Sequence, residues 1–161
     1  MTRNVLFLCT GNSARSIMAE ALLNHWGRGS YWAFSAGSHP TGTVNPYALQ
    51  LLKQKGIPCH GARSKSWDEF AQPGAPDIGF IFTVCDAAAS ETCPIWPGHP
   101  TTAHWGVQDP AAVEGDDATK AAAFERAFDV LEHRIKLFVS LPYASLGKAR
   151  LREIGASLPG G

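Results

Sequence analysis

Short apolar runs alternate along the chain with segments whose apolar residues recur at helical spacing. Residues 4–9 and 31–36 are rich in apolar, β-branched and aromatic residues, which predicts two buried strands. Residues 16–26 and 45–55 place their apolar residues on one helical face, and a glycine follows each segment. Because parallel strands need a crossover between them, the order strand, helix, strand, helix predicts a mainly parallel sheet.

The second half of the chain continues this alternation. Residues 78–85 are apolar almost throughout, which predicts a strand covered on both faces, and residues 102–105 predict a short further strand. Residues 85–100 between them are rich in proline, which is typical of a long irregular loop with a functional role. Residues 118–141 predict one long amphipathic helix, which Pro142 ends.

These elements predict a single α/β domain. We expect a three-layer sandwich with a central four-stranded parallel sheet and flavodoxin-like winding over residues 1–141. The length of 161 residues suits one compact core. Residues 142–161 end in Pro-Gly-Gly and are expected to form a tail of doubtful order, with one helical turn or none.

Composition then narrows the function classes. Hydrophobic residues make up 45% of the chain and charged residues 17%, which excludes a disordered protein. Fourteen Lys and Arg balance fourteen Asp and Glu, so no net charge attracts nucleic acid or an anionic membrane. No apolar run has a membrane-spanning length and no signal-peptide cleavage site follows the first residues, so we expect a cytoplasmic protein. The four cysteines then indicate thiol chemistry or metal binding.

The loop after the first predicted strand carries the candidate chemistry. Cys9 ends the strand, Arg15 follows six residues later, and the predicted helix begins directly after it, at about Ser16. The loop N–H groups and the positive end of the helix are expected to bind a tetrahedral oxyanion and to lower the pKa of the Cys9 thiol. The oxyanion-binding residues expected are Thr10, Gly11, Asn12, Ser13, Ala14 and Arg15.

Individual side chains of this loop have separate expected roles. Arg15 supplies a bidentate fork, Ser16 a hydrogen bond to the Cys9 thiolate, and Gly11 a turn that a side chain would obstruct. The lysine of a nucleotide-binding GxxxxGK[ST] loop is absent, which argues against ATP or GTP as the ligand. The simpler alternative is a buried strand cysteine followed by a surface arginine, since this spacing also occurs by chance.

The segment from Val5 to Ser16 resembles the low-molecular-weight tyrosine phosphatase superfamily, and more narrowly its arsenate reductase branch. The resemblance spans roughly residues 4–140 and includes Phe34-Ser35-Ala36-Gly37, Val44-Asn45-Pro46, His104-Trp105-Gly106 and Asp109-Pro110. It implies the low-molecular-weight phosphatase-like fold, with Asp109 as the general acid that protonates a departing oxygen. Without the resemblance, Asp109-Pro110 is an ordinary turn.

Cys85 and Cys93 distinguish a reductase from a phosphatase, because reduction of arsenate requires two electrons from thiols. The resemblance to thioredoxin-coupled arsenate reductases implies that Cys9 attacks arsenate, Cys85 then attacks the Cys9 sulfur, and Cys93 receives the disulfide. Cys9 and Cys85 both end strands, where parallel sheets bind ligands. The segment from Cys85 to Cys93 is slightly longer than in the thioredoxin-coupled pattern, so glutathione with glutaredoxin stays open as the reductant. Phosphate and sulfate are expected competitors of arsenate.

Two other functions remain open. A low-molecular-weight protein tyrosine phosphatase uses the same nucleophile, arginine and aspartate, although Ala111 stands where such phosphatases carry an aromatic residue. A thiol-based arsenite- or metal-binding module would use Cys85 and Cys93 as soft ligands, but it leaves Arg15 and Asp109 without a role.

No cofactor or metal is expected. The six histidines show no zinc-binding spacing, and Cys59 has no partner in any motif. In some relatives a potassium ion lies near the residues that correspond to Asn12 and Ser35, and Lys65 is a candidate to supply that charge here. The alternative is that residues 63–66 form a solvated polar loop.

Overall fold

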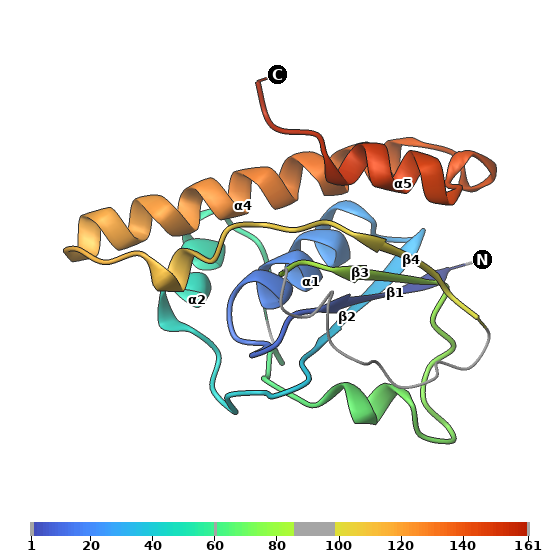
Figure 1. Cartoon of the computed structure of the whole chain (residues 1–161), viewed down its shortest axis with the longest axis horizontal. Helices are drawn as coiled ribbons and strands as arrows, with labels where there is room; N and C mark the ends of the chain where they lie inside the picture. The colour runs from blue at the N-terminus through green and yellow to red at the C-terminus, as the bar shows by residue number, and fades with distance from the viewer. Residues whose placement is uncertain (1, 60, 86–98, 161) are drawn as a thin grey trace.

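A parallel sheet forms the centre of this computed structural model, which describes residues 2–59, 61–85 and 99–160. Its four strands have the order β2-β1-β3-β4, and every neighbouring pair is parallel. The strands are β1 (Arg3–Leu8), β2 (Tyr31–Ala36), β3 (Phe80–Thr83) and β4 (Thr101–His104). The predicted α/β class and central four-stranded parallel sheet are therefore confirmed (Figure 1).

Helices connect and cover these strands, and the three long helices predicted from periodicity are found with ends within one residue of those expected. The α-helices are α1 (Arg15–Trp26), α2 (Pro46–Gln54), α4 (Asp117–Ser140) and α5 (Lys148–Gly155), and the 3-10 helices are η1 (Trp67–Phe70), η2 (Pro110–Ala112) and η3 (Tyr143–Ser145). The side chains of Asn45 and Asp116 accept N–H groups of Tyr47 and Thr119, which caps α2 and α4. None of the described helices is both long and apolar enough for a membrane span.

The two faces of the sheet bury different side chains. Val5 and Phe7 point to the face that α1, α2, α4 and α5 cover. Leu6 and Leu8 point to the opposite face, where they pack with Phe70 of η1. Figure 1 shows α4 and α5 on one side of the sheet and η1, the short green helix, on the other. The chain thus has the three layers expected.

The C-terminal segment differs from its expectation. Residues 142–160 contain η3 and the eight-residue helix α5, not a tail of doubtful order with one helical turn or none. Leu146, Leu151 and Ile154 are buried in the main core, and Trp105 Nε1 donates to the Leu151 carbonyl at 2.9 Å. A helix this short is marginal alone, so tertiary packing stabilises it. The expectation of one helical turn or none is therefore wrong.

Candidate active site

Cys9 and Cys85 lie side by side at the carboxyl ends of β1 and β3. The two strands pair in register, Leu8 opposite Thr83, so the residues that follow them reach the same edge of the sheet. Both cysteines are buried, at 5% and 3% exposure. The backbone N–H of Thr10 donates to Cys85 Sγ at 3.3 Å, and Thr10 Oγ1 lies 3.7 Å from the same sulfur. The structure thus brings together two of the three expected redox cysteines.

The pKa of the Cys9 thiol is raised in the structure, whereas the sequence predicted that it is lowered. The hydrogen bond with the Cys85 thiol and then burial raise the pKa of the Cys9 thiol well above its usual value. Arg15 and the N–H of Gly11 act in the opposite direction but are outweighed. The expected lowering of the Cys9 pKa is therefore wrong for this arrangement, because the neighbouring Cys85 thiol and burial outweigh the loop N–H group and Arg15. Two thiols in contact titrate as a coupled pair.

The loop that follows Cys9 forms one wall of a cavity of about 800 Å³. Its lining residues are Cys9, Thr10, Gly11, Asn12, Ser13, Ala14, Arg15, Thr41, Cys85, Gly106, Val107, Gln108, Asp109 and Ala111. Helix α1 begins at the end of this loop, and its N-cap residue, Ala14, offers no side-chain hydrogen bond to the first turn. Because Ala14 and Arg15 at the start of α1 line the cavity, the positive end of the helix borders it, which suits an oxyanion.

Asn12 shapes the turn of this loop. Its φ is 45°, in the left-handed region that asparagine tolerates better than most residues, and the side chain is fully buried. Asn12 Nδ2 donates to Ser16 Oγ at 2.8 Å, and Asn12 Oδ1 accepts the N–H of Lys65 at 2.9 Å. The turn residue is therefore Asn12 and not Gly11, whose missing side chain leaves room for Thr41. Because Asn12 is the donor, the Ser16 hydroxyl hydrogen stays available, and its predicted bond to Cys9 stays a prediction.

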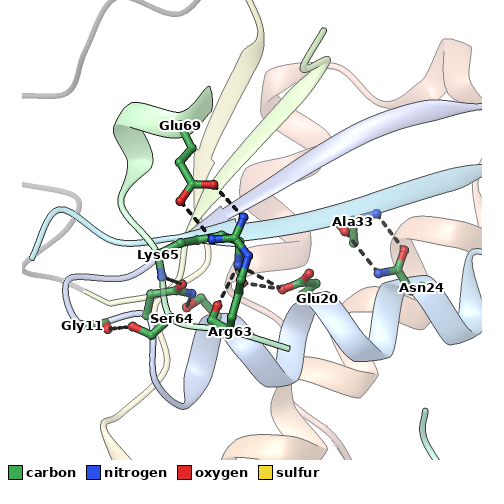
Figure 2. A network of polar contacts seen from close by, with 11 residues as sticks. Gly11, Glu20, Asn24, Ala33, Arg63, Ser64, Lys65 and Glu69 are labelled. Carbon is green, nitrogen blue, oxygen red and sulfur yellow. Dashed lines mark hydrogen bonds and ion pairs between the residues drawn. The ribbon is translucent and has the colours of Figure 1, made fainter. Parts of the chain in front are cut away.

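The Lys65 ammonium is buried next to the loop that follows Cys9, and it contacts several polar groups. Lys65 Nζ donates to the Arg63 carbonyl at 2.8 Å, and it lies 3.5 Å from Ser35 Oγ and 3.9 Å from Glu20 Oε1. Burial raises the pKa of Glu20 and lowers that of Lys65. Figure 2 shows Lys65 and Glu20 facing each other in this network. The ammonium thus lies where the resemblance suggested a positive charge, and Lys65 is not part of a solvated loop.

Gly37 and Ser64, for which the sequence predicted no role in shaping the loop after Cys9, contact that loop. A Cβ at Gly37 would lie 2.6 Å from the carbonyl oxygen of Cys9 and closer still to that of Thr10. Ser64 Oγ donates to the Gly11 carbonyl at 3.1 Å (Figure 2). A glycine directly after a strand was the one available signal, because it permits such a close approach of two backbones.

Arg15 joins the loop to the segment that carries Asp109. Arg15 Nη1 donates to the Val107 carbonyl at 3.0 Å, and Nη2 lies 3.5 Å from Asp109 Oδ2. Asp109 Oδ1 accepts the N–H of Ala111 at 3.0 Å and so caps η2. The Arg15 side chain is 15% exposed and the Asp109 side chain 42%, so the carboxylate reaches the cavity mouth. The arginine and the aspartate singled out in the sequence therefore meet across the cavity.

The other two cysteines of the chain are Cys59 and Cys93. Cys93 lies outside the described residues, so its predicted role stays a prediction. Cys59 is a half-buried free thiol that packs against the main core, away from the cavity lining. Within residues 2–59, 61–85 and 99–160, no group of His, Cys, Asp and Glu could hold a metal ion.

Known proteins resemble this chain in sequence and in fold. Residues 4–152 match the family model described as low molecular weight phosphotyrosine protein phosphatase. An arsenate reductase of Halalkalibacterium halodurans is 40% identical over 138 residues, which cover 83% of this chain and 93% of that protein. The crystal structure of arsenate reductase from Archaeoglobus fulgidus superposes with a TM-score of 0.66 at 29% identity, covering 85% of this chain and 99% of that one.

A low molecular weight protein tyrosine phosphatase from T. tengcongensis also superposes, with a TM-score of 0.69 at 24% identity over 87% of this chain and 100% of that one. At that identity the likeness shows a shared fold. The family match over residues 4–152 spans both Cys9 and Asp109. The chain belongs to the low molecular weight phosphotyrosine protein phosphatase family.

Proposed function

We propose that this protein is an arsenate reductase that converts arsenate to arsenite. The observation that carries the proposal is the contact between the Cys9 and Cys85 thiols at one end of the cavity. A phosphatase of this family needs one thiol nucleophile, whereas reduction of arsenate needs two electrons, which a pair of thiols supplies by forming a disulfide. The 40% identity to a relative named arsenate reductase supports the same reaction.

In the first step, the Cys9 sulfur attacks arsenic and one arsenate hydroxyl leaves as water. The S–As bond forms, the As–O bond breaks, and Asp109 gives the leaving oxygen its proton, which the Cys9 thiol proton replaces overall. Arg15 turns from Asp109 to the remaining oxygens, which also accept loop N–H groups. Arsenic is not reduced in this step.

In the second step, the Cys85 sulfur attacks the Cys9 sulfur. The S–S bond forms and the S–As bond breaks, and its electron pair stays on arsenic, which leaves as arsenite. The two thiols have then lost two electrons and two protons, and arsenic has gained the two electrons. The N–H of Thr10, which donates to Cys85 Sγ at 3.3 Å, stabilises negative charge on the attacking sulfur.

The resulting disulfide has to be reduced before the next turnover. We propose that Cys93 receives it and that an external thiol system, of the thioredoxin type or glutathione with glutaredoxin, restores the thiols. Because the cycle requires three reduced cysteines, the cytoplasm is the proposed compartment. Phosphate and sulfate are proposed to compete for the same oxyanion site, since they share the tetrahedral shape and the charge of arsenate.

A low molecular weight protein tyrosine phosphatase is the second candidate. The arrangement of Cys9, Arg15 and Asp109 around one cavity favours it, because these three groups suffice for ester hydrolysis. Ala111 lines the cavity where an aromatic residue would grip a phosphotyrosine ring, and a buried second thiol has no part in hydrolysis. The reductase therefore accounts for more of the site.

The test is arsenite production from arsenate by the purified chain. One reaction contains thioredoxin, thioredoxin reductase and NADPH, a second contains glutathione and glutaredoxin, and hydrolysis of p-nitrophenyl phosphate is measured in parallel. Turnover that is lost in Cys85→Ser and kept in Cys59→Ser supports the reductase with Cys85 in the relay. No arsenite with either reductant, together with brisk ester hydrolysis that survives Cys85→Ser, would overturn it.

A further inference from the structure

Arg134 of α4 is a buried guanidinium that has no carboxylate partner among the described residues. It is 4% exposed, and burial lowers the pKa of this arginine. Nη1 donates to the carbonyls of Trp105 and Gly106, each at 3.0 Å, and Nε donates to the carbonyl of Ser157 at 3.2 Å. A buried charge is costly unless hydrogen bonds compensate it, so a charged side chain here indicates a specific task.

The carbonyls that Arg134 binds stand at the base of the loop that carries Asp109. Trp105 and Gly106 directly follow β4, and the N–H groups of Trp105 and Val107 donate to carbonyls at the end of β3, at 2.7 and 3.0 Å. The carbonyl of Val107 accepts from Arg15 Nη1 at 3.0 Å. Three successive carbonyls, at 105, 106 and 107, therefore accept from two arginines, Arg134 on α4 and Arg15 at the start of α1.

The end of α5 and the residues after it also contact this part of the chain, at His104, Trp105 and Arg134. A Cβ at Gly155 would lie 2.7 Å from the His104 carbonyl oxygen and 2.7 Å from Trp105 Cδ1, so the helix end touches the strand that leads into the loop. The Ser157 carbonyl, two residues later, accepts from Arg134 Nε. One guanidinium thus joins α4, the loop base and the C-terminal segment.

We propose that Arg134 is a positioning residue: by holding the backbone at Trp105 and Gly106, it fixes where the Asp109 carboxyl group lies in the cavity. Asp109 follows the fixed residues 105–107 by two positions, so a shift of that base moves the carboxyl group. Lysine cannot replace Arg134, because an ammonium has no planar fork to hold Ser157 and the two loop carbonyls in fixed directions. The inference rests on the proposed function in so far as Asp109 is the general acid.

The experiment is a double-mutant comparison on the full chain. Wild type, Arg134→Lys, Asp109→Asn and the double variant are compared for kcat with arsenate and for inhibition by orthophosphate. We expect Arg134→Lys to lower kcat about tenfold or more, part of what a general acid contributes, with the phosphate inhibition constant within about twofold of wild type. In the Asp109→Asn background the same substitution is expected to cost less than about twofold, since the misplaced group is already gone.

An equal loss of kcat in both backgrounds, or a matching loss of phosphate affinity, would overturn the proposal, because a merely structural role predicts either. Arg126→Lys, exposed on the same helix, is the matched control and keeps kcat. Circular dichroism of Arg134→Lys checks that the variant is folded, and Arg134→Gln is used in its place if it is not.

The wild-type reaction separates the two proposals. Arsenite production by wild type tests the reductase itself. If wild type instead only hydrolyses p-nitrophenyl phosphate, the reductase fails, and the same four chains are compared on ester hydrolysis, where Asp109 also has a leaving oxygen to protonate. A loss in Arg134→Lys that disappears in the Asp109→Asn background still supports the positioning role there, and an equal loss still overturns it.

Discussion

The backbone N–H of Thr10 donates a hydrogen bond to Cys85 Sγ at 3.3 Å. This N–H belongs to the loop that begins at Cys9, yet it donates to the sulfur of Cys85, which follows the neighbouring strand β3. An N–H donor stabilises a thiolate, so the loop that binds the oxyanion also favours charge on the second thiol. The two chemical steps proposed for the enzyme therefore share one short stretch of backbone.

Replacement of Cys85 by alanine is expected to lower the pKa of the Cys9 thiol, because the hydrogen bond with Cys85 is the largest cause that raises it. Alkylation of Cys9 by iodoacetamide requires the thiolate. Its rate, followed by peptide mass spectrometry across a pH series, is expected to reach half its maximum at a lower pH in Cys85→Ala than in wild type. Cys59→Ala leaves the profile unchanged. An unchanged or upward-shifted profile in Cys85→Ala would contradict the coupled pair.

Asp109→Asn is expected to lower kcat for arsenate by about 100-fold, the usual contribution of a general acid. Stability is expected to change little, because asparagine also caps η2 at Ala111 and the ion pair with Arg15 is partly exposed. Steady-state kinetics and a thermal melt measure both effects. Glu114→Gln, exposed shortly after the loop, is the control. A kcat within about threefold of wild type would remove Asp109 from the acid role.

Asn12→Ala is expected to destabilise the fold by about 2–4 kcal/mol, since it loses two buried hydrogen bonds and puts alanine at a φ of 45°. Asn12→Gly loses the same hydrogen bonds but adopts that φ freely, so its loss is expected to be smaller by about 1 kcal/mol. Urea unfolding of both variants measures the difference. Equal losses would show that the left-handed backbone contributes nothing.

Leu151→Ala in α5 is expected to destabilise the fold by about 2–5 kcal/mol, because this side chain is fully buried in the core. Leu158→Ala, where the side chain is 58% exposed, is expected to stay within about 0.5 kcal/mol of wild type. Thermal or urea unfolding of the pair shows whether the C-terminal segment belongs to the folding unit. Similar small effects in both would restore the tail as a separate, loosely attached segment.

The local pattern of apolar and polar residues was sufficient to predict most of the strands and the long helices. The second strand was predicted at residues 31–36, where the structure has β2, because a continuous apolar run between turn residues leaves little choice. Cys9 and Arg15 were singled out by residue type and spacing and Asp109 by the family resemblance, and all three line the cavity. Periodicity and motif spacing are short-range signals, and these features depend mainly on them.

The errors come from contacts between distant segments. The pKa of Cys9 depends on Cys85, which is 76 residues away in sequence but lies next to Cys9 beyond the ends of the neighbouring strands β1 and β3. The order of α5 depends on docking of Leu151 against the core, which its own weak helical pattern does not show. Arg134 has the pattern of an ordinary helix residue, and its partners lie 28 and 29 residues earlier and 23 later.

The most direct test of the proposed relay is a single turnover of Cys93→Ser with arsenate and no external reductant, followed by quantification of arsenite and disulfide mapping by mass spectrometry. The relay predicts about one arsenite per chain and a disulfide between Cys9 and Cys85. The Cys85→Ser, Cys93→Ser double variant, which cannot form that disulfide, is expected to release none. Free Cys9 and Cys85 thiols with no arsenite, in a chain that still hydrolyses p-nitrophenyl phosphate, would contradict the relay.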